Sequence, residues 1–222
     1  MPSVLVTGAG RGIGLELARQ YSADGWDVIA TVRAGTARLG LEGLGARVEQ
    51  LDMRDFAALA SFGERLAGAP LDLFIANAGV SGPQRIGNPQ LAADWQDVHA
   101  VNAVAPTLLA EALLPNILAA EGKMVAITSR MGSIADSSGG YIAYRASKAA
   151  LNAAWRALAL DLAARPVTLA LFHPGWVQTD MGGRSAPLAV SESVASLRRT
   201  IAGLTPKDSG SFLDRDGSPI PW

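Results

Sequence analysis

The chain has 222 residues, of which 49% are hydrophobic and 18% are charged, and its formal net charge is −1. This composition is typical of one globular α/β domain with a well-buried core, and we expect a single domain over residues 1–222. The balanced charge, without any run of Lys or Arg, argues against a nucleic-acid partner, because sequence-independent binding to nucleic acid requires clustered cations.

Metal, disulfide and membrane signals are weak in this sequence. Cysteine is absent, which excludes disulfides and thiolate chemistry, and the two histidines, His99 and His173, are too few and too far apart to indicate a metal site. The N-terminal residues show no signal-peptide pattern. The longest apolar stretch, 108–120, is interrupted by Glu111 and is too short to span a bilayer. We therefore expect a soluble cytoplasmic protein with no metal and no membrane partner.

Short apolar runs alternate with helical patterns along the chain. The predicted strands lie near residues 3–7, 26–32, 46–51, 71–76, 123–129, 167–172 and 211–214. Several of these runs are apolar on both faces, as expected when helices cover both sides of a parallel sheet. The alternation predicts an α/β fold of the Rossmann-like, doubly wound type, with one strand for each of these runs.

The helix after the first strand is the clearest of the predicted helices. Ile13, Leu17, Ala18 and Tyr21 recur at helical spacing, and Gly25 stands where a C-terminal cap belongs. The second predicted helix, within 34–45, is interrupted by four glycines. We expect it to be short or irregular.

A glycine-rich turn joins the first strand to the first helix. Gly8 lets the chain turn tightly, Gly12 lets the backbone approach a pyrophosphate, and Gly14 lets the helix pack closely on the sheet. The amides at the helix N-terminus would then face the negative charge. The spacing is G-x-x-x-G-x-G, with Ile13 at the third glycine position of the usual dinucleotide pattern. The position between a strand and a helix predicts a dinucleotide cofactor.

Tyr144 and Lys148 stand four residues apart on a predicted helix, so their side chains share one face. An ammonium close to a phenol favours the phenolate and lowers a pKa that is about 10 in water. This pairing predicts that Tyr144 serves as a general acid or base near neutral pH. Tyr141 and Arg145 have the same spacing, and they are the alternative pair.

These two patterns together resemble the short-chain dehydrogenase/reductase family, and the resemblance covers nearly the whole chain. The family's Asn-Ala-Gly occurs at 77–79, its helical asparagine at Asn102, and a Pro-Gly-x-x-x-Thr segment at 174–179. The stretches 128–134 and 214–222 resemble the small C-factor-like branch of that family. The order and spacing of these short motifs are jointly specific.

The resemblance implies four catalytic residues. In such enzymes the tyrosine, here Tyr144, exchanges a proton with the substrate oxygen, and Lys148 also holds the nicotinamide ribose. Ser129 would orient the substrate oxygen, and Asn102 would complete a proton path through water. An alternative for Asn102 is a structural role at a helix bend.

The serine assignment has a competitor. Ser129 lies about two residues further from Tyr144 than is common in the family, and Ser133 lies between them. Ser129 matches the strand-end Ser-x-x-Gly pattern, with the glycine at position 132. The pair Gly139-Gly140 could absorb the extra length as a loop, so Ser129 is preferred and Ser133 is second.

The resemblance also implies a cofactor site. Its residues would be Gly8, Arg11, Gly12, Ile13, Gly14, Arg33, Asp52, Met53, Asn77, Ala78, Gly79, Tyr144, Lys148, Pro174, Gly175, Val177 and Thr179. Arg33 ends the second predicted strand with no acid beside it, which favours NADP (NADPH) over NAD. Arg11 could reach the same phosphate, although both arginines could instead be solvated surface charges. Asp52 would contact adenine, with a turn role as the alternative.

The implied activity is hydride transfer between nicotinamide and a carbonyl or secondary alcohol, as in a carbonyl reductase. Only residues 180–190 separate the last cofactor motif from the next helical pattern, so we expect an open site and a small-molecule substrate that the sequence does not specify. The alternatives are a nucleotide-binding signalling protein of C-factor type and, less well supported, a sugar-nucleotide epimerase. Small residues on the fifth predicted helix predict a homodimer or homotetramer. They are Ala149, Ala150, Ala153, Ala154 and Ala157, although they could simply face the sheet.

Overall fold

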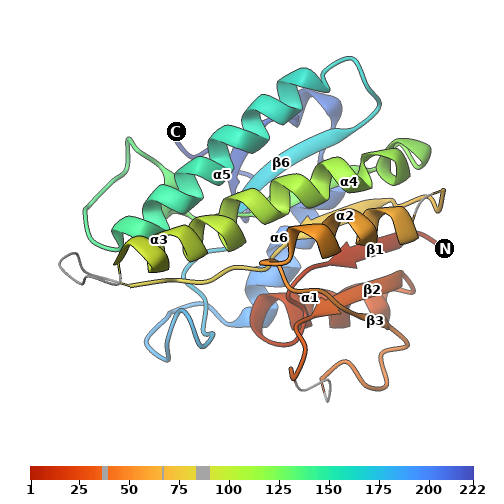
Figure 1. The fold of residues 1–222 in the computed structure, drawn as a ribbon, viewed down its shortest axis with the longest axis horizontal. Helices are drawn as coiled ribbons and strands as arrows, with labels where there is room; N and C mark the ends of the chain where they lie inside the picture. The colour runs from red at the N-terminus through yellow and green to blue at the C-terminus, as the bar shows by residue number, and fades with distance from the viewer. Residues whose placement is uncertain (37–39, 67, 84–90) are drawn as a thin grey trace.

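The computed structural model describes residues 1–36, 40–66, 68–83 and 91–222. Within these residues, seven strands form one parallel sheet in the order β3-β2-β1-β4-β5-β6-β7 (Figure 1). The strands are β1 Ser3–Val6, β2 Asp27–Val32, β3 Arg47–Gln50, β4 Leu73–Ala76, β5 Lys123–Ile127, β6 Thr168–His173 and β7 Ser211–Asp214. The doubly wound sheet predicted from the sequence is confirmed, and each strand lies at its expected place in the chain.

Helices cover both faces of this sheet. They are α1 Gly12–Ala23, α2 Phe56–Arg65, α3 Leu91–His99, α4 Ala105–Ala119, α5 Ile142–Asp161 and α6 Val190–Gly203. Helices α2, α4 and α5 pack on one face, and α1 and α6 on the other (Figure 1). Leu5 of β1 belongs to the first layer, whereas Val4 and Val6 belong to the second. Both faces of a strand are therefore apolar because both are covered.

The larger layer is built around two aromatic side chains. Trp155 of α5 is fully buried, and its ring centre lies 6.3 Å from that of Phe74 on β4. Leu109 and Leu113 of α4 are also fully buried in this layer. Burial of such side chains contributes about 1.5 to 3 kcal/mol each. This packing holds α5 rigidly against the sheet, and α5 carries the predicted proton donor.

Helices α3 and α4 form one continuous run through a π-helical turn at Ala100–Val104. The most apolar 18-residue window of this run, Leu91–Ala119, has a mean hydropathy of 1.4, so the run is long and apolar enough to cross a membrane by length and composition. The sequence interpretation, which considered 108–120 alone, did not foresee it. More than half of its most apolar window is buried within the fold. A buried core helix passes the same test.

The stretch 34–45 contains no helix among its described residues, and residues 37–39 lie outside them. Gly35, Gly43 and Gly45 have φ angles of 74°, 80° and 68°, in the left-handed region that favours glycine. The described residues of this stretch, 34–36 and 40–45, therefore form turns and no part of the predicted short or irregular helix.

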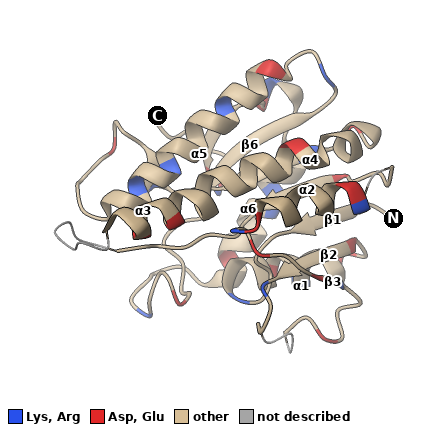
Figure 2. Ribbon diagram, in the orientation of Figure 1, with Lys and Arg blue, Asp and Glu red and all other residues tan. Residues whose placement is uncertain are grey.

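The strand order reverses direction between β1 and β4. In open parallel sheets, ligands bind in the crevice outside the carboxyl ends of the strands at such a point. Charges of both signs are interspersed over the helices and loops (Figure 2). The topology, rather than the distribution of charge, therefore indicates a ligand site at the loops after β1, β4 and β6.

Candidate active site

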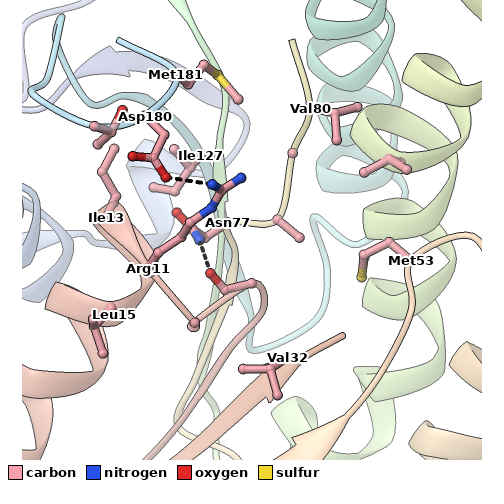
Figure 3. A pocket seen from close by; sticks show the side chains of 18 of the residues that line it. Arg11, Ile13, Leu15, Val32, Met53, Asn77, Val80, Ile127, Asp180 and Met181 are labelled. Carbon is pink, nitrogen blue, oxygen red and sulfur yellow. Dashed lines mark hydrogen bonds and ion pairs between the residues drawn. The ribbon is translucent and has the colours of Figure 1, made fainter. Parts of the chain in front are cut away.

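A cavity of about 550 Å³ lies at the carboxyl ends of the strands. Fifteen residues predicted from the sequence line it: Gly8, Arg11, Gly12, Ile13, Gly14, Arg33, Asp52, Met53, Asn77, Ala78, Gly79, Tyr144, Lys148, Pro174 and Thr179. Figure 3 shows part of this wall, with Ile13 and Asn77 on it. Four other predicted residues, Asn102, Ser129, Gly175 and Val177, are not on the wall. The fold thus brings together side chains from distant parts of the chain.

The glycine loop has the geometry that a phosphate group requires. Gly8 and Gly12 have φ angles of 67° and 56°. A Cβ atom at Gly14 would lie 2.4 Å from the main-chain oxygen of Gly8, so only glycine allows this close packing. Helix α1 has no side-chain cap at Arg11, which leaves its first amides available. The loop therefore fits a pyrophosphate at the helix N-terminus.

The carboxyl ends of β1 and β4 are tied together beneath this loop. The hydroxyl of Thr7 accepts hydrogen bonds from the amides of Asn77 and Ala78, at 3.0 and 3.1 Å. The Asn77 side chain donates to the main-chain oxygen of Thr7 at 2.9 Å. These bonds fix the floor of the cavity. Thr7 was not assigned a role from the sequence, although it begins the glycine motif.

The two predicted phosphate-binding arginines lie differently. Arg33 is exposed on the cavity wall at the end of β2. The guanidinium of Arg11 instead points toward Asp180, with which it makes a 2.5 Å ion pair (Figure 3). Both of these side chains are more than 70% exposed, so the pair contributes at most about 1 kcal/mol. Arg33 is the better-placed cation for a phosphate at this end of the cavity.

The loop after β3 adds a residue that sequence reasoning missed. Arg54 lines the cavity and makes two hydrogen bonds to the carboxylate of Asp97 on α3, at 2.5 and 2.7 Å. The Arg54 hydrogen bond holds the pKa of Asp97 below its usual value. Asp52 accepts from the amide of Arg54 at 3.0 Å, so the turn role considered for Asp52 is present, and Asp52 also lines the cavity.

Tyr144 and Lys148 share one face of α5 at the cavity. The Lys148 ammonium lies 5.8 Å from the centre of the Tyr144 ring, and it donates a 2.9 Å hydrogen bond to the main-chain oxygen of Ile127. Burial lowers the pKa of Lys148 to about 8. Burial also raises the pKa of Tyr144 to about 12, against a smaller lowering by a hydrogen bond with Ser129. The sequence prediction of a lowered phenol pKa is therefore not met, because desolvation outweighs the hydrogen bond with Ser129.

Ser129, rather than Ser133, is the serine that meets Tyr144. Ser129 is buried, stands before the 3₁₀ turn Arg130–Gly132, and accepts a 3.1 Å bond from the amide of Met131. The Ser133 hydroxyl is engaged elsewhere, with the main-chain oxygen of Trp222 at 3.2 Å. The extra chain length is taken up by a loop before α5, in which Gly139 and Gly140 have positive φ. This geometry favours Ser129 over Ser133 as the serine of the site.

Tyr141 does not form the alternative pair. The Arg145 guanidinium donates to the main-chain oxygens of Gly139 and Gly140, both at 3.0 Å, and to Ser138. Tyr141 itself is 38% exposed and precedes α5. Arg145 thus holds the loop, and Tyr144 is the tyrosine that lies at the cavity.

Asn102 lies inside the π-helical turn and is almost fully buried. Its side-chain oxygen accepts from the amide of Val80, and its side-chain nitrogen donates to the Val80 main-chain oxygen, both at 2.8 Å. The nitrogen also donates to the Ser147 hydroxyl at 3.0 Å, which in turn donates to the main-chain oxygen of Tyr144. A helix-bend role is therefore present, and the proton path through Asn102 stays a prediction.

The sequence profile of the short chain dehydrogenases matches residues 2–187. The chain belongs to this family. The curated protein C-signal of Myxococcus xanthus is 42% identical over 166 residues, which are 74% of this chain and all of that protein. This relationship places the chain close to the C-factor branch, as the sequence predicted. The family and its oxidoreductase chemistry thus accord with the cavity.

Solved structures of short-chain carbonyl reductases are similar to this chain over its whole length. The carbonyl reductase Sniffer of Drosophila melanogaster is 32% identical, with a TM-score of 0.89 and full coverage of both chains. A carbonyl reductase of Pseudomonas aeruginosa in complex with NADP is 35% identical, with a TM-score of 0.88 and full coverage of both chains. The fold and the arrangement of strands therefore match those of short-chain carbonyl reductases.

Among the described residues, no group of three or more His, Asp or Glu side chains is placed to hold a metal ion. His173, at the end of β6, is half-buried, and burial lowers its pKa to about 4. It lies in register with Asp214 of β7. The titratable groups that line the cavity are Tyr144, Lys148, several arginines and the carboxylates of Glu16, Asp52 and Asp180.

Proposed function

We propose that this protein is an NADP-dependent reductase of small carbonyl compounds, with Tyr144 as the proton donor. The observation that carries the proposal is the meeting of Tyr144 with Ser129 beside a cavity that Lys148 also lines. A hydroxyl pair of this kind can bind and protonate one carbonyl oxygen. The carbonyl reductases of similar structure support the same chemistry.

Different residues orient the substrate, donate the proton and bind the cofactor. A bound nicotinamide supplies the hydride. Ser129 donates a hydrogen bond to the substrate oxygen and orients it, and the hydroxyl of Tyr144 donates the proton as negative charge develops there. Lys148 stays positively charged below its pKa of about 8, which stabilises that charge and places a donor at the ribose. Asn102 would connect this group to solvent through water.

The cofactor preference rests on Arg33. This side chain is exposed on the cavity wall at the end of β2, where the ribose 2′-position of a dinucleotide lies in such folds. An arginine there binds a 2′-phosphate, whereas an acid would bind the free hydroxyl. The adjoining residues Val32 and Ala34 carry no charge. NADPH is therefore the proposed cofactor, and the NADP complex of the Pseudomonas relative is consistent with it.

The direct test measures oxidation of NADPH by the purified protein with panels of aldehydes, ketones and quinones. We expect turnover with at least one class, and slower turnover with NADH at the same concentration. Absence of turnover with every class, in a protein that still binds NADPH, would contradict the proposal. The same panel would identify the substrate class.

A second candidate function is a signalling role in which nucleotide binding matters and turnover does not. The 42% identity to C-signal favours it. The complete set of Ser129, Tyr144 and Lys148 favours catalysis, because a pure nucleotide sensor has no need of a proton donor. Replacing Tyr144 with Phe separates the two, since a sensor would keep its biological effect. We further propose that the protein acts in the cytoplasm.

A further inference from the structure

The loop from Arg130 to Tyr141 joins the proposed catalytic serine to the helix of the proposed proton donor. After its short 3₁₀ turn, the loop has no regular structure until α5 begins at Ile142. Its last residues, Gly139, Gly140 and Tyr141, have φ angles of 81°, 70° and 50°. The left-handed conformation at Tyr141 costs about 1 to 2 kcal/mol. A strained loop of this kind keeps one conformation only when neighbouring segments hold it.

One such contact comes from the far end of the chain. The main-chain oxygen of Trp222 accepts hydrogen bonds from the amides of Ile134 and Ala135, at 2.7 and 3.0 Å. It also accepts from the hydroxyl of Ser133 at 3.2 Å. Three donors of the loop thus converge on one acceptor. This acceptor lies nearly ninety residues away in sequence.

A second contact is ionic. Arg130 donates to the carboxylates of Asp136 and Asp214, both at 3.1 Å. Asp136 belongs to the loop, whereas Asp214 ends β7 and its side chain is only 13% exposed. A buried carboxylate requires charged or hydrogen-bonded partners, and Asp214 has Arg130 on one oxygen and the amide and guanidinium of Arg215 on the other, at 2.8 and 3.3 Å. Arg130 directly follows the proposed catalytic serine.

The segment that provides these contacts is itself fixed on the sheet. The ring centres of Trp222 and Phe212 are 5.6 Å apart, and Phe212 is buried in β7. Ile220 is also buried, and its amide donates to the main-chain oxygen of Phe212 at 2.9 Å. Residues 214–222 therefore fold back on β7 and form a firm support for the loop.

We propose that residues 214–222 position the catalytic serine for carbonyl reduction, acting through Arg130 and through the main-chain oxygen of Trp222. Arg130 is then a positioning residue, since it acts through Ser129 and does not line the cavity. This inference rests on the proposed function. It assigns a role in turnover to a segment that lies outside the cofactor-binding loops.

The first experiment compares Arg130→Gln with Arg47→Gln. The two arginine side chains are similarly exposed, at 47% and 53%, and each pairs with a carboxylate, but Arg47 lies on β3 and pairs with Glu49. We expect Arg130→Gln to lower kcat by about ten- to a hundredfold, the scale of a small misplacement at the reacting atoms. NADPH affinity should stay within about twofold, and Arg47→Gln should leave both quantities unchanged. Arg130→Lys should restore part of the turnover, because it keeps one ion pair.

The second experiment tests the Trp222 contact. Trp222→Gly removes the ring that packs on Phe212, and we expect faster hydrogen exchange at the amides of Ile134 and Ala135 together with a lower kcat. Faster exchange with unchanged kcat would overturn the inference, as would an Arg130→Gln variant with the kcat of the Arg47→Gln control. An unaltered protein that turns over no carbonyl would overturn the proposed function and this inference together. Turnover that survives the loss of both contacts would overturn the inference alone.

Discussion

The ammonium of Lys148 lies 5.8 Å from the centre of the Tyr144 ring and is anchored to the main-chain oxygen of Ile127. Helix α5 supplies both side chains, and the end of β5 supplies the anchor. Burial moves the two pKa values in opposite directions, to about 8 for the lysine and about 12 for the tyrosine. Near neutral pH both groups therefore carry their protons, which is the state required for donation to a carbonyl oxygen.

These values predict the pH dependence of reduction. The lysine charge is present below about pH 8 and is lost above it, whereas the phenol keeps its proton throughout this range. The rate of carbonyl reduction should be level on the acidic side and fall as the pH rises through about 8. The measurement is kcat/KM from about pH 6 to about pH 10. A rate that rises steadily over this interval would contradict the assignment. In Lys148→Met this fall near pH 8 should be absent and activity low throughout.

The role of Arg33 predicts a change in cofactor preference. Arg33→Asp should weaken NADPH binding by roughly 1.5 to 3 kcal/mol, the scale of a charge-assisted hydrogen bond, and shift the preference toward NADH. Arg47→Asp, an exposed arginine outside the cavity wall, is the control. Cofactor fluorescence titrations give both affinities. Equal affinity of the unaltered protein for NADPH and NADH would refute the assignment.

Exposed apolar residues on α4, on α5 and at the end of the π-helical turn before α4 predict self-association. Val104, Leu108 and Leu160 are 43%, 38% and 59% exposed, and Ala153 and Ala157 are exposed with them, whereas Ala150 and Ala154 pack on the core. We expect a homodimer or homotetramer paired through this face. Leu160→Glu should shift the mass measured by light scattering toward the monomer. The control is Phe56→Glu, at a 41% exposed position on α2. A monomeric mass for the unaltered protein at micromolar concentration would exclude the assembly.

His173 predicts a loss of stability in mild acid. Its pKa is about 4 in the folded protein, against about 6.5 in an unfolded chain, because burial disfavours the charged ring. Between these values the unfolded chain binds the additional proton, so stability falls as the pH drops from about 6.5 to about 4. The loss is at most about 3.5 kcal/mol, at about 1.4 kcal/mol per pKa unit.

Urea unfolding of the unaltered protein and of His173→Gln at both ends of this range measures the effect. The variant should lose less stability on acidification than the unaltered protein. An equal loss in the two proteins would mean that other groups are responsible.

Local patterns were enough to predict the sheet, the glycine loop and the Tyr144–Lys148 pair. Each of these depends on residues that are close in sequence or on simple hydrophobic periodicity. The direction of the Tyr144 pKa shift could not be predicted, because desolvation depends on everything packed around the ring. Arg11 was expected to reach a phosphate, but its guanidinium pairs with Asp180. This ion pair could not be predicted, because Asp180 is distant in sequence.

Several contacts at the site follow only from the tertiary fold. Arg54, in the loop after β3, meets Asp97 on α3, and Trp222 meets the loop before α5, with no local signal for either contact. Thr7 and Ser147 each stand next to a recognised motif residue, so their adjacency could have identified them. The described turns at 34–36 and 40–45 differ from the predicted helix because glycine conformations override a weak helical pattern there.

The most direct test of this account is turnover by Tyr144→Phe beside Tyr141→Phe, with NADPH affinity measured for both. Tyr144→Phe keeps the ring and removes the only hydroxyl assigned to protonate the carbonyl oxygen, so kcat should fall by about 10² to 10⁴ while NADPH binding persists. Tyr141→Phe should retain near-normal turnover. A Tyr144→Phe variant with more than about a tenth of normal turnover, beside an inactive Tyr141→Phe, would contradict the assignment of the proton donor.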